Sequence, residues 1–322
     1  MESSPFEVAP LITLSSEVWL VDSGKSSHQQ QQEIGKEVVS ALQRSGFLLI
    51  QSDIMPRELQ NQALQDATSW LTGSSSNPLV TTHPTDPKSY VMLDAKHKQD
   101  DELALLQPYF TPALMEYWNA CEKLKMCVLR AIGVGLQVLE NPEDLSAWHS
   151  QSEHSAMRLL YYPPATATTG NRCKAHSDYG SCTLLSTDGV SGLEILLDGK
   201  WWPVPHVPGA MVVNIGSLLS EWTTTTSAHD DKNNVPPLLA TLHRVAGPAS
   251  ENSASDPSVL RQAMAQGRTS IAFFADPDND TPLAQKGTSI EDYIAWRSGG
   301  SHEDRSGIAF TAAEQDLMRP EK

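Results

Sequence analysis

Cysteine, positive charge and long apolar runs are all scarce in this chain of 322 residues. The four cysteines form no Cys-x-x-Cys pair and the N-terminus has no secretory signal, so we expect reduced thiols and no disulfide framework. No apolar run approaches the ~20 residues of a membrane span. Lysine and arginine number 23 against 39 acidic residues, and a net charge of −16 disfavours binding to a nucleic-acid backbone. We therefore expect a cytoplasmic, monomeric protein with neither membrane nor nucleic-acid partners.

The N-terminal half carries mainly helical patterns. Ser27-x-x-Gln30 is a capping box that begins a helix, and Gly46 stands where that helix would end. Thr111 and Pro112 supply a cap and a first-turn proline for a long amphipathic helix. The expected helices cover residues 27–45, 55–71 and 111–139, the short strands 9–14 and 47–50, and a long loop 72–100.

From Arg158 onward, short β-type runs alternate with Gly and Pro turns. The expected strands cover residues 158–162, 181–186, 192–197, 211–215, 239–245 and 269–274. Strands of this number and spacing favour a sandwich or jelly roll. The polar stretches 223–237 and 247–266 are expected to be loops, and 289–297 and 311–317 to be closing helices.

Three candidate metal ligands lie in this β-rich half. His176 and Asp178 are two residues apart, so their side chains face the same way on an extended backbone. His243 lies in another strand candidate and is expected to bring a third ligand from across the sandwich. Two imidazoles and one carboxylate form the ligand set of non-haem iron(II) oxygenases. A lone strand histidine is by default a core residue, so the prediction rests on the combination. Cys173 flanks this segment, but a thiolate would be a superfluous ligand.

Arg268 and Ser270 follow the same two-residue rule on the last strand candidate. An inward-facing arginine in a β-sandwich is costly unless it is paired. A guanidinium fork beside a hydroxyl suits a carboxylate ligand, whereas an internal Asp or Glu is the alternative partner.

These residues lie in segments that resemble the plant and fungal type of iron(II)/2-oxoglutarate-dependent dioxygenases, the superfamily that includes isopenicillin N synthase. The resemblance runs nearly end to end and is most specific at residues 175–196, AHSDYGSCTLLSTDGVSGLEIL. It extends to RLLYYPP at 158–164 and GRTSIAFFADP at 267–277. Two residues depart from the usual pattern, since Ser217 replaces an aspartate and Leu160 replaces an asparagine.

The resemblance implies an α+β protein with a mainly β core, a double-stranded β-helix (jelly roll) with flanking helices. A helical and mixed region at residues 1–150 would pack on a catalytic core at 151–285, followed by a C-terminal helical segment at 286–322. The implied Fe(II) ligands are His176, Asp178 and His243, and the implied contacts to the distal carboxylate of 2-oxoglutarate are Arg268, Ser270 and Tyr162.

The implied reaction oxidises a C–H bond of a small organic metabolite with dioxygen and 2-oxoglutarate, by hydroxylation or desaturation, and releases succinate and CO2. Ascorbate is a candidate reductant. We expect the loop around Lys88 and Tyr90, and strand residues such as Leu184, to line the substrate pocket. Two alternatives stay open: an oxidase in which Arg268 and Ser270 hold the substrate's own carboxylate, and a non-catalytic binding protein on the same fold.

Overall fold

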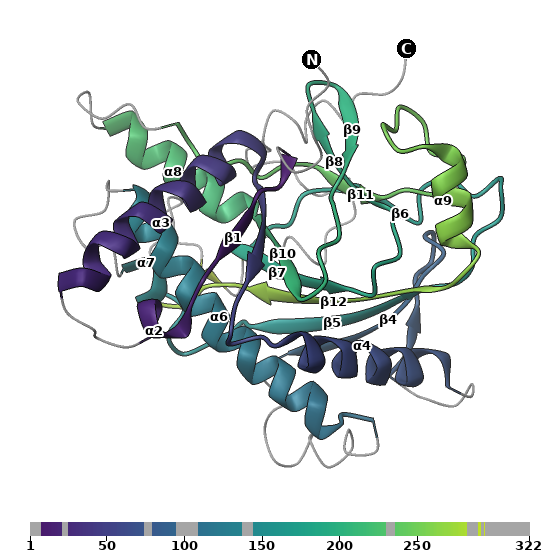
Figure 1. The fold of residues 1–322 in the computed structure, drawn as a ribbon, viewed down its shortest axis with the longest axis horizontal. Coiled ribbons are helices and arrows are strands. Elements are labelled where there is room, and N and C mark those ends of the chain that lie inside the picture. Colours follow the sequence, from purple (N-terminus) through teal and green to yellow (C-terminus); the bar gives the residue numbers. More distant parts are fainter. Residues whose placement is uncertain are drawn as a thin grey trace.

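Two facing β-sheets form the centre of the molecule, with helices on the outer face of the larger sheet (Figure 1). The computed structural model describes residues 8–20, 25–73, 79–94, 109–136, 144–229, 236–281, 289–290 and 293. Among the helices of these residues, none combines the length and apolar character that crossing a membrane requires.

The larger sheet has eight strands and the smaller has four. The larger runs in the order β1 (Leu11–Thr13), β2 (Phe47–Gln51), β10 (Ala210–Ile215), β7 (Cys182–Thr187), β12 (Arg268–Ala275), β5 (Ala156–Tyr162), β4 (Ser89–Asp94) and β3 (Thr81–Thr82). The smaller runs in the order β6 (Cys173–His176), β11 (His243–Val245), β8 (Leu193–Leu197) and β9 (Lys200–Pro203). Neighbouring strands pair antiparallel except β1 and β2, which are parallel.

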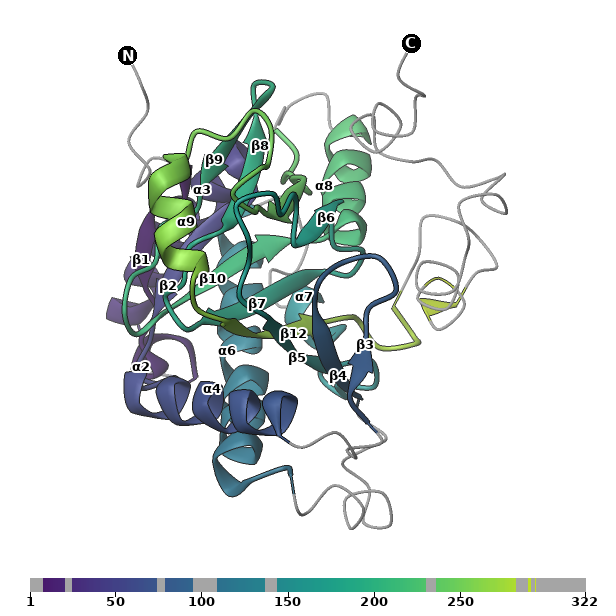
Figure 2. The ribbon, with the colours of Figure 1, turned by 90° about the vertical axis from the view of Figure 1, so that its right-hand side faces the viewer.

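Three long helices pack against the outer face of the larger sheet: α3 (Lys25–Ser45), α4 (Arg57–Thr72) and α6 (Pro112–Leu136). Figure 2 shows α4 and α6 from the side, below the sheet. The helices α3 and α6 cross at Gly35 and Gly135, where a Cβ built on Gly135 would lie 2.1 Å from the Gly35 carbonyl oxygen. Only glycine permits so close a backbone approach. The shorter helices are α2 (Ser16–Trp19), α7 (Asp144–Ala147), α8 (Ser217–His229) and α9 (Pro257–Met264).

Side-chain alternation along β12 assigns each residue to one of two layers. Ile271 and Phe273 pack into the core beneath the helices, while Ala272 and Phe274 face the smaller sheet. Both faces are buried, so the strand reads as a nearly unbroken apolar run after Ser270. The functional side chains project into the layer between the sheets.

The structure confirms the jelly-roll architecture, in which the two sheets pack face to face. Three loop predictions were wrong in part. Within residues 72–100, β4 forms because it pairs with β5. In the first polar stretch, α8 continues to His229, and the helix is anchored by Leu219, which is buried. In the second, α9 begins after Asp256, whose side chain accepts a hydrogen bond from the Ser258 amide. Most of the expected closing helices lies outside the described residues, and the domain boundaries stay a prediction.

Candidate functional site

His176, Asp178 and His243 converge at one point of the smaller sheet. His176 ends β6, Asp178 follows two residues later, and His243 begins β11 directly opposite His176 in the antiparallel register. The Asp178 Oδ1 atom lies 3.8 Å from His176 Nε2 and 3.7 Å from His243 Nε2. The three ligand atoms all lie within 4.8 Å of one another. The prediction that His243 comes from across the sandwich was wrong, because β6 and β11 are neighbours in one sheet.

Backbone carbonyls orient both imidazoles of this triad. His176 Nδ1 lies 2.9 Å from the Lys174 carbonyl oxygen, and His243 Nδ1 lies 3.2 Å from that of Thr241. A carbonyl only accepts, so each Nδ1 carries a proton, and Nε2 is the atom of each imidazole that would present a lone pair to a metal ion at the triad centre. Burial lowers the pKa of His243 to about 4, which favours the neutral form that coordinates metal.

The Asp178 carboxylate is held by two side chains of the larger sheet. Its Oδ2 accepts hydrogen bonds from Thr183 Oγ1 at 2.5 Å and Asn214 Nδ2 at 2.7 Å, which leaves Oδ1 toward the histidines. Burial disfavours the charged form, but the two histidines and these two donors hold the pKa of Asp178 below its usual value. An ionised carboxylate beside two oriented imidazoles fits a divalent cation such as Fe(II).

Arg268 is a buried cation with no acidic partner among the described residues. Its side chain donates to Ser270 Oγ at 3.2 Å and to the Val190 carbonyl oxygen at 3.1 Å, and it stacks 5.2 Å from the Tyr162 ring centroid. Arg268 is only 1% exposed. A buried arginine with neutral contacts alone is costly, so this geometry calls for an anion. The alternative of an internal Asp or Glu partner finds no support in the described residues.

One cavity joins the triad to Arg268 and Ser270. It lies between the two sheets and is lined by Phe47, Lys88, Arg158, Leu160, Tyr162, Cys173, His176, Asp178, Thr183, Leu185, Leu193, Asn214, His243, Val245, Arg268, Ser270, Ala272 and Phe274. Every residue that the sequence pointed to as a ligand of metal or carboxylate is therefore in one chamber.

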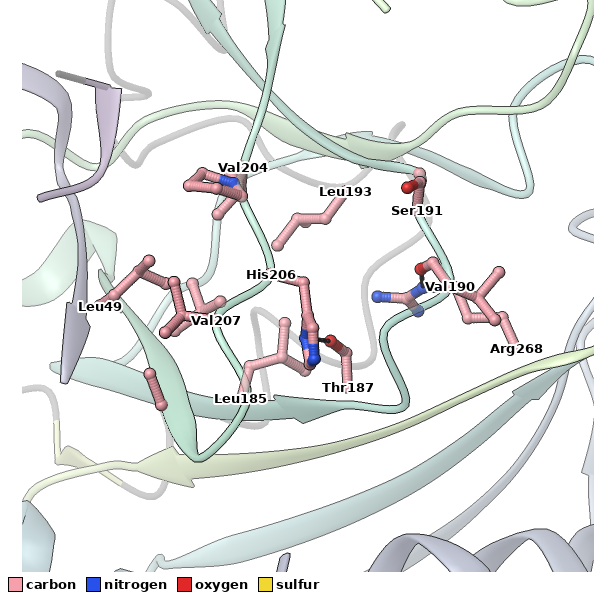
Figure 3. Close-up of a pocket in the computed structure, with 14 residues that line it drawn as sticks. Leu49, Leu185, Thr187, Val190, Ser191, Leu193, Val204, His206, Val207 and Arg268 are labelled. Atoms are coloured by element: carbon pink, nitrogen blue, oxygen red, sulfur yellow. Dashed lines mark hydrogen bonds between the residues drawn. The ribbon is translucent and has the colours of Figure 1, made fainter. Parts of the chain in front are cut away.

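A second, smaller hollow reaches Arg268 from another side (Figure 3). Thr187 and His206 line it, joined by a hydrogen bond of 3.2 Å between Oγ1 and Nδ1. Burial lowers the pKa of His206, which favours the neutral imidazole. Leu185, Leu193 and Arg268 line both hollows.

Sequence reasoning located some lining residues and misplaced others. Lys88 lines the cavity, as expected, but Leu184 points the other way into the core beneath the helices. Its neighbours Thr183 and Leu185 face the cavity instead. Cys173 also lines the cavity, and its Sγ accepts a hydrogen bond of 2.9 Å from Lys88 Nζ.

The contacts of Ser217 and Asn214 with Asp178 had no signal in the sequence. Ser217 replaces the usual aspartate, and its amide and hydroxyl both donate to the Asp178 carbonyl oxygen. Asn214 donates to the carboxylate of the same residue. Only the sheet order brings these positions together.

Comparison with known proteins agrees with this geometry. Residues 153–277 match the model of the 2OG-Fe(II) oxygenase superfamily. The chain is 31% identical over 180 residues to the 2-oxoglutarate-dependent dioxygenase htyE of Aspergillus rugulosus, a match that covers 54% of this chain and 49% of that protein. The chain thus spans about half the length of the first such relatives.

Longer matches extend to the N-terminal region. The proline hydroxylase buaE of Petromyces alliaceus is 26% identical over 298 residues, covering 79% of this chain and 84% of that protein. The solved structure of a full-length Neurospora crassa protein in complex with alpha-KG and 5-formyluracil aligns with a TM-score of 0.68. That alignment covers 92% of this chain and 99% of the other at 19% identity, so it shows the fold.

Proposed function

We propose that this chain, whose residues 153–277 match the 2OG-Fe(II) oxygenase superfamily, is a 2-oxoglutarate-dependent dioxygenase that oxidises a C–H bond of a small organic molecule. In this proposal Fe(II) and 2-oxoglutarate are its cofactors, and dioxygen is the oxidant. The observation that carries it is one cavity that holds three converging candidate ligands and a buried arginine without an acidic partner among the described residues.

His176, Asp178 and His243 are the residues that would bind Fe(II). Bound together, Fe(II) and 2-oxoglutarate supply the activation of dioxygen, with succinate and CO2 as products. The protein contributes orientation: two backbone carbonyls fix the imidazoles, and Thr183 and Asn214 fix the carboxylate.

Arg268 and Ser270 would hold the distal carboxylate of 2-oxoglutarate. The guanidinium offers a planar fork of N–H donors, and the Ser270 hydroxyl lies beside it. The Tyr162 side chain stacks against the guanidinium and keeps it in place. Apolar side chains such as Leu185 also line the cavity, and charge pairing is stronger beside an apolar wall than in bulk water.

Two measurements test the proposal. Anaerobic addition of Fe(II) and 2-oxoglutarate should produce a visible charge-transfer band that is absent in His176→Ala. With oxygen, the wild-type protein should convert 2-oxoglutarate to succinate, slowly alone and faster with substrate. Substrate oxidation without succinate would identify a 2-oxoglutarate-independent oxidase, and the absence of the band in the wild type would favour a binding protein.

The type of oxidation, the need for ascorbate, the oligomeric state and the location need further measurements. Hydroxylation and desaturation are distinguished by the mass of the product, and any need for ascorbate by its omission. The monomeric state and cytoplasmic location stay predictions, which size-exclusion chromatography and cell fractionation address.

A further inference from the structure

Arg158 is a second cation that projects into the same cavity. It lies on β5, with its alternate neighbours Leu160 and Tyr162 also lining the cavity. Its Cζ atom lies 5.3 Å from the ring centroids of both Tyr90 and Phe274. These contacts occupy the faces of the guanidinium, and they leave its N–H edge to be explained.

The N–H edge of Arg158 has no partner in the described part of the chain. No side chain or carbonyl there accepts a hydrogen bond from it, no carboxylate pairs with it, and its Nε is buried without a partner. Lys88, a further basic residue that lines the cavity, forms an ion pair with Asp86, with 3.0 Å between Nζ and Oδ2. An arginine carries five N–H donors and cannot be deprotonated in proteins. Arg158 is partly exposed, its Nε is buried without a hydrogen-bond partner, and it has no acidic partner among the described residues, so its guanidinium is suited to bind a ligand anion.

The spacing on β12 separates Arg158 from the site proposed for 2-oxoglutarate. Arg158 pairs with Ala272, four residues along β12 from Arg268. At roughly 3.3 Å per residue, the two arginines leave the sheet about 13 Å apart. A five-carbon dicarboxylate held between the metal and Arg268 leaves Arg158 unneutralised.

The charges of the loaded site lead to the same result. The two charges of Fe(II), together with Arg268, balance Asp178 and the two carboxylates of 2-oxoglutarate. The positive charge of Arg158, which lines the same cavity, is then left without a compensating anion in the described part of the chain.

We propose that Arg158 binds a carboxylate of the primary substrate, which is therefore a small carboxylic acid with an apolar body. This inference rests on the proposed function. The fork of Arg158 matches a carboxylate in two parallel hydrogen bonds. Leu160, Val245, Ala272 and Phe274 line the space beside it and provide an apolar surface for the rest of the molecule.

The test compares acids with their uncharged amides on the full chain under anaerobic conditions, saturated with Fe(II) and 2-oxoglutarate. The probes are phenylacetate, cinnamate and hexanoate, each against its primary amide, measured by calorimetry and by the shift of the charge-transfer band. At least one acid should bind ten- to a hundredfold more tightly than its amide, as a charged hydrogen-bonded pair provides. The band must persist, because an acid that displaced 2-oxoglutarate would be bound at Arg268.

Variants assign the preference to one side chain. Arg158→Gln should abolish it while the charge-transfer band, which reports an intact fold and metal site, stays. Arg158→Lys should keep part of it, since the charge remains but the fork is lost. Arg57→Gln removes an exposed arginine of α4 and should change nothing.

Two results would overturn the inference while leaving the proposed function intact. In one, the band and succinate form but no acid binds more tightly than its amide. In the other, the preference survives in Arg158→Gln. Absence of both band and succinate in the wild type would instead overturn the proposed function, and this inference with it.

Discussion

Replacing Asn214 by alanine should weaken Fe(II) binding about ten- to a hundredfold. The Asn214 amide donates to Asp178 Oδ2 at 2.7 Å in a buried environment. A hydrogen bond to a charged group contributes roughly 1.5–3 kcal/mol, and every ~1.4 kcal/mol is a factor of ten in affinity. Loss of one such partner behind a metal ligand typically costs ten- to a hundredfold in metal affinity, which agrees with that range.

The assay is an anaerobic competition between the protein and a chelator for Fe(II). Thr183→Val removes the other donor to Asp178 Oδ2 with little change of shape, so its effect should be similar. Asn61→Ala, on the exposed face of α4, is the matched control. Circular dichroism checks that each variant is folded. An unchanged Fe(II) affinity in folded Asn214→Ala and Thr183→Val would refute the argument that these donors prepare the carboxylate for metal.

Three further predictions concern Arg268, the crossing of α3 and α6, and the buried His149. Arg268→Gln should weaken 2-oxoglutarate binding roughly a hundredfold, equivalent to ~3 kcal/mol for a broken buried charge pair, whereas Arg261→Gln on the surface should leave calorimetric binding unchanged. Gly135→Ala should lower the free energy of unfolding by about 1–3 kcal/mol in urea titrations, because its methyl group would collide with Gly35; an unchanged midpoint would contradict the close crossing. Burial lowers the pKa of His149 to about 3. Between pH 3 and about 6.5, its ordinary pKa, this histidine is protonated in the unfolded chain but neutral in the folded chain. The free energy of unfolding therefore falls as the pH falls through this window. His149→Gln should remove up to about 1.4 kcal/mol per pH unit of that slope, as measured by unfolding at several pH values, and an identical slope would argue against a neutral buried His149.

The sequence was informative wherever one strand or helix determined the outcome by itself. Gly46 ends α3 with a φ of 71°, and Thr111 caps α6 by accepting from the Leu114 amide. The two-residue spacing of Arg268 and Ser270 correctly predicted that both face one cavity. These features depend on local periodicity, which a sequence carries directly. The roles assigned to the site residues stay predictions until binding is measured.

Features that depend on the pairing of distant strands were beyond the sequence. Pattern alone could not determine which face of β7 is turned to the cavity, and Leu184 was assigned to the wrong face because a shift of one residue exchanges the faces. The strand at Ser89–Asp94 lies in a polar region and exists because β5 offers an edge to pair with. The lack of an acidic partner for Arg158 within the described residues likewise depends on how several strands are brought together.

The triad connects the smaller sheet to the larger one. His176 and His243 stand on β6 and β11 of the smaller sheet, while Asp178 is hydrogen-bonded to Thr183 and Asn214 on β7 and β10 of the larger. A bound cation would therefore link the two sheets. Because it binds the folded chain, it would raise the free energy of unfolding by about 2.7 kcal/mol at a concentration a hundred times its dissociation constant. The supply of the metal would then affect the free energy of unfolding of the chain as well as its activity.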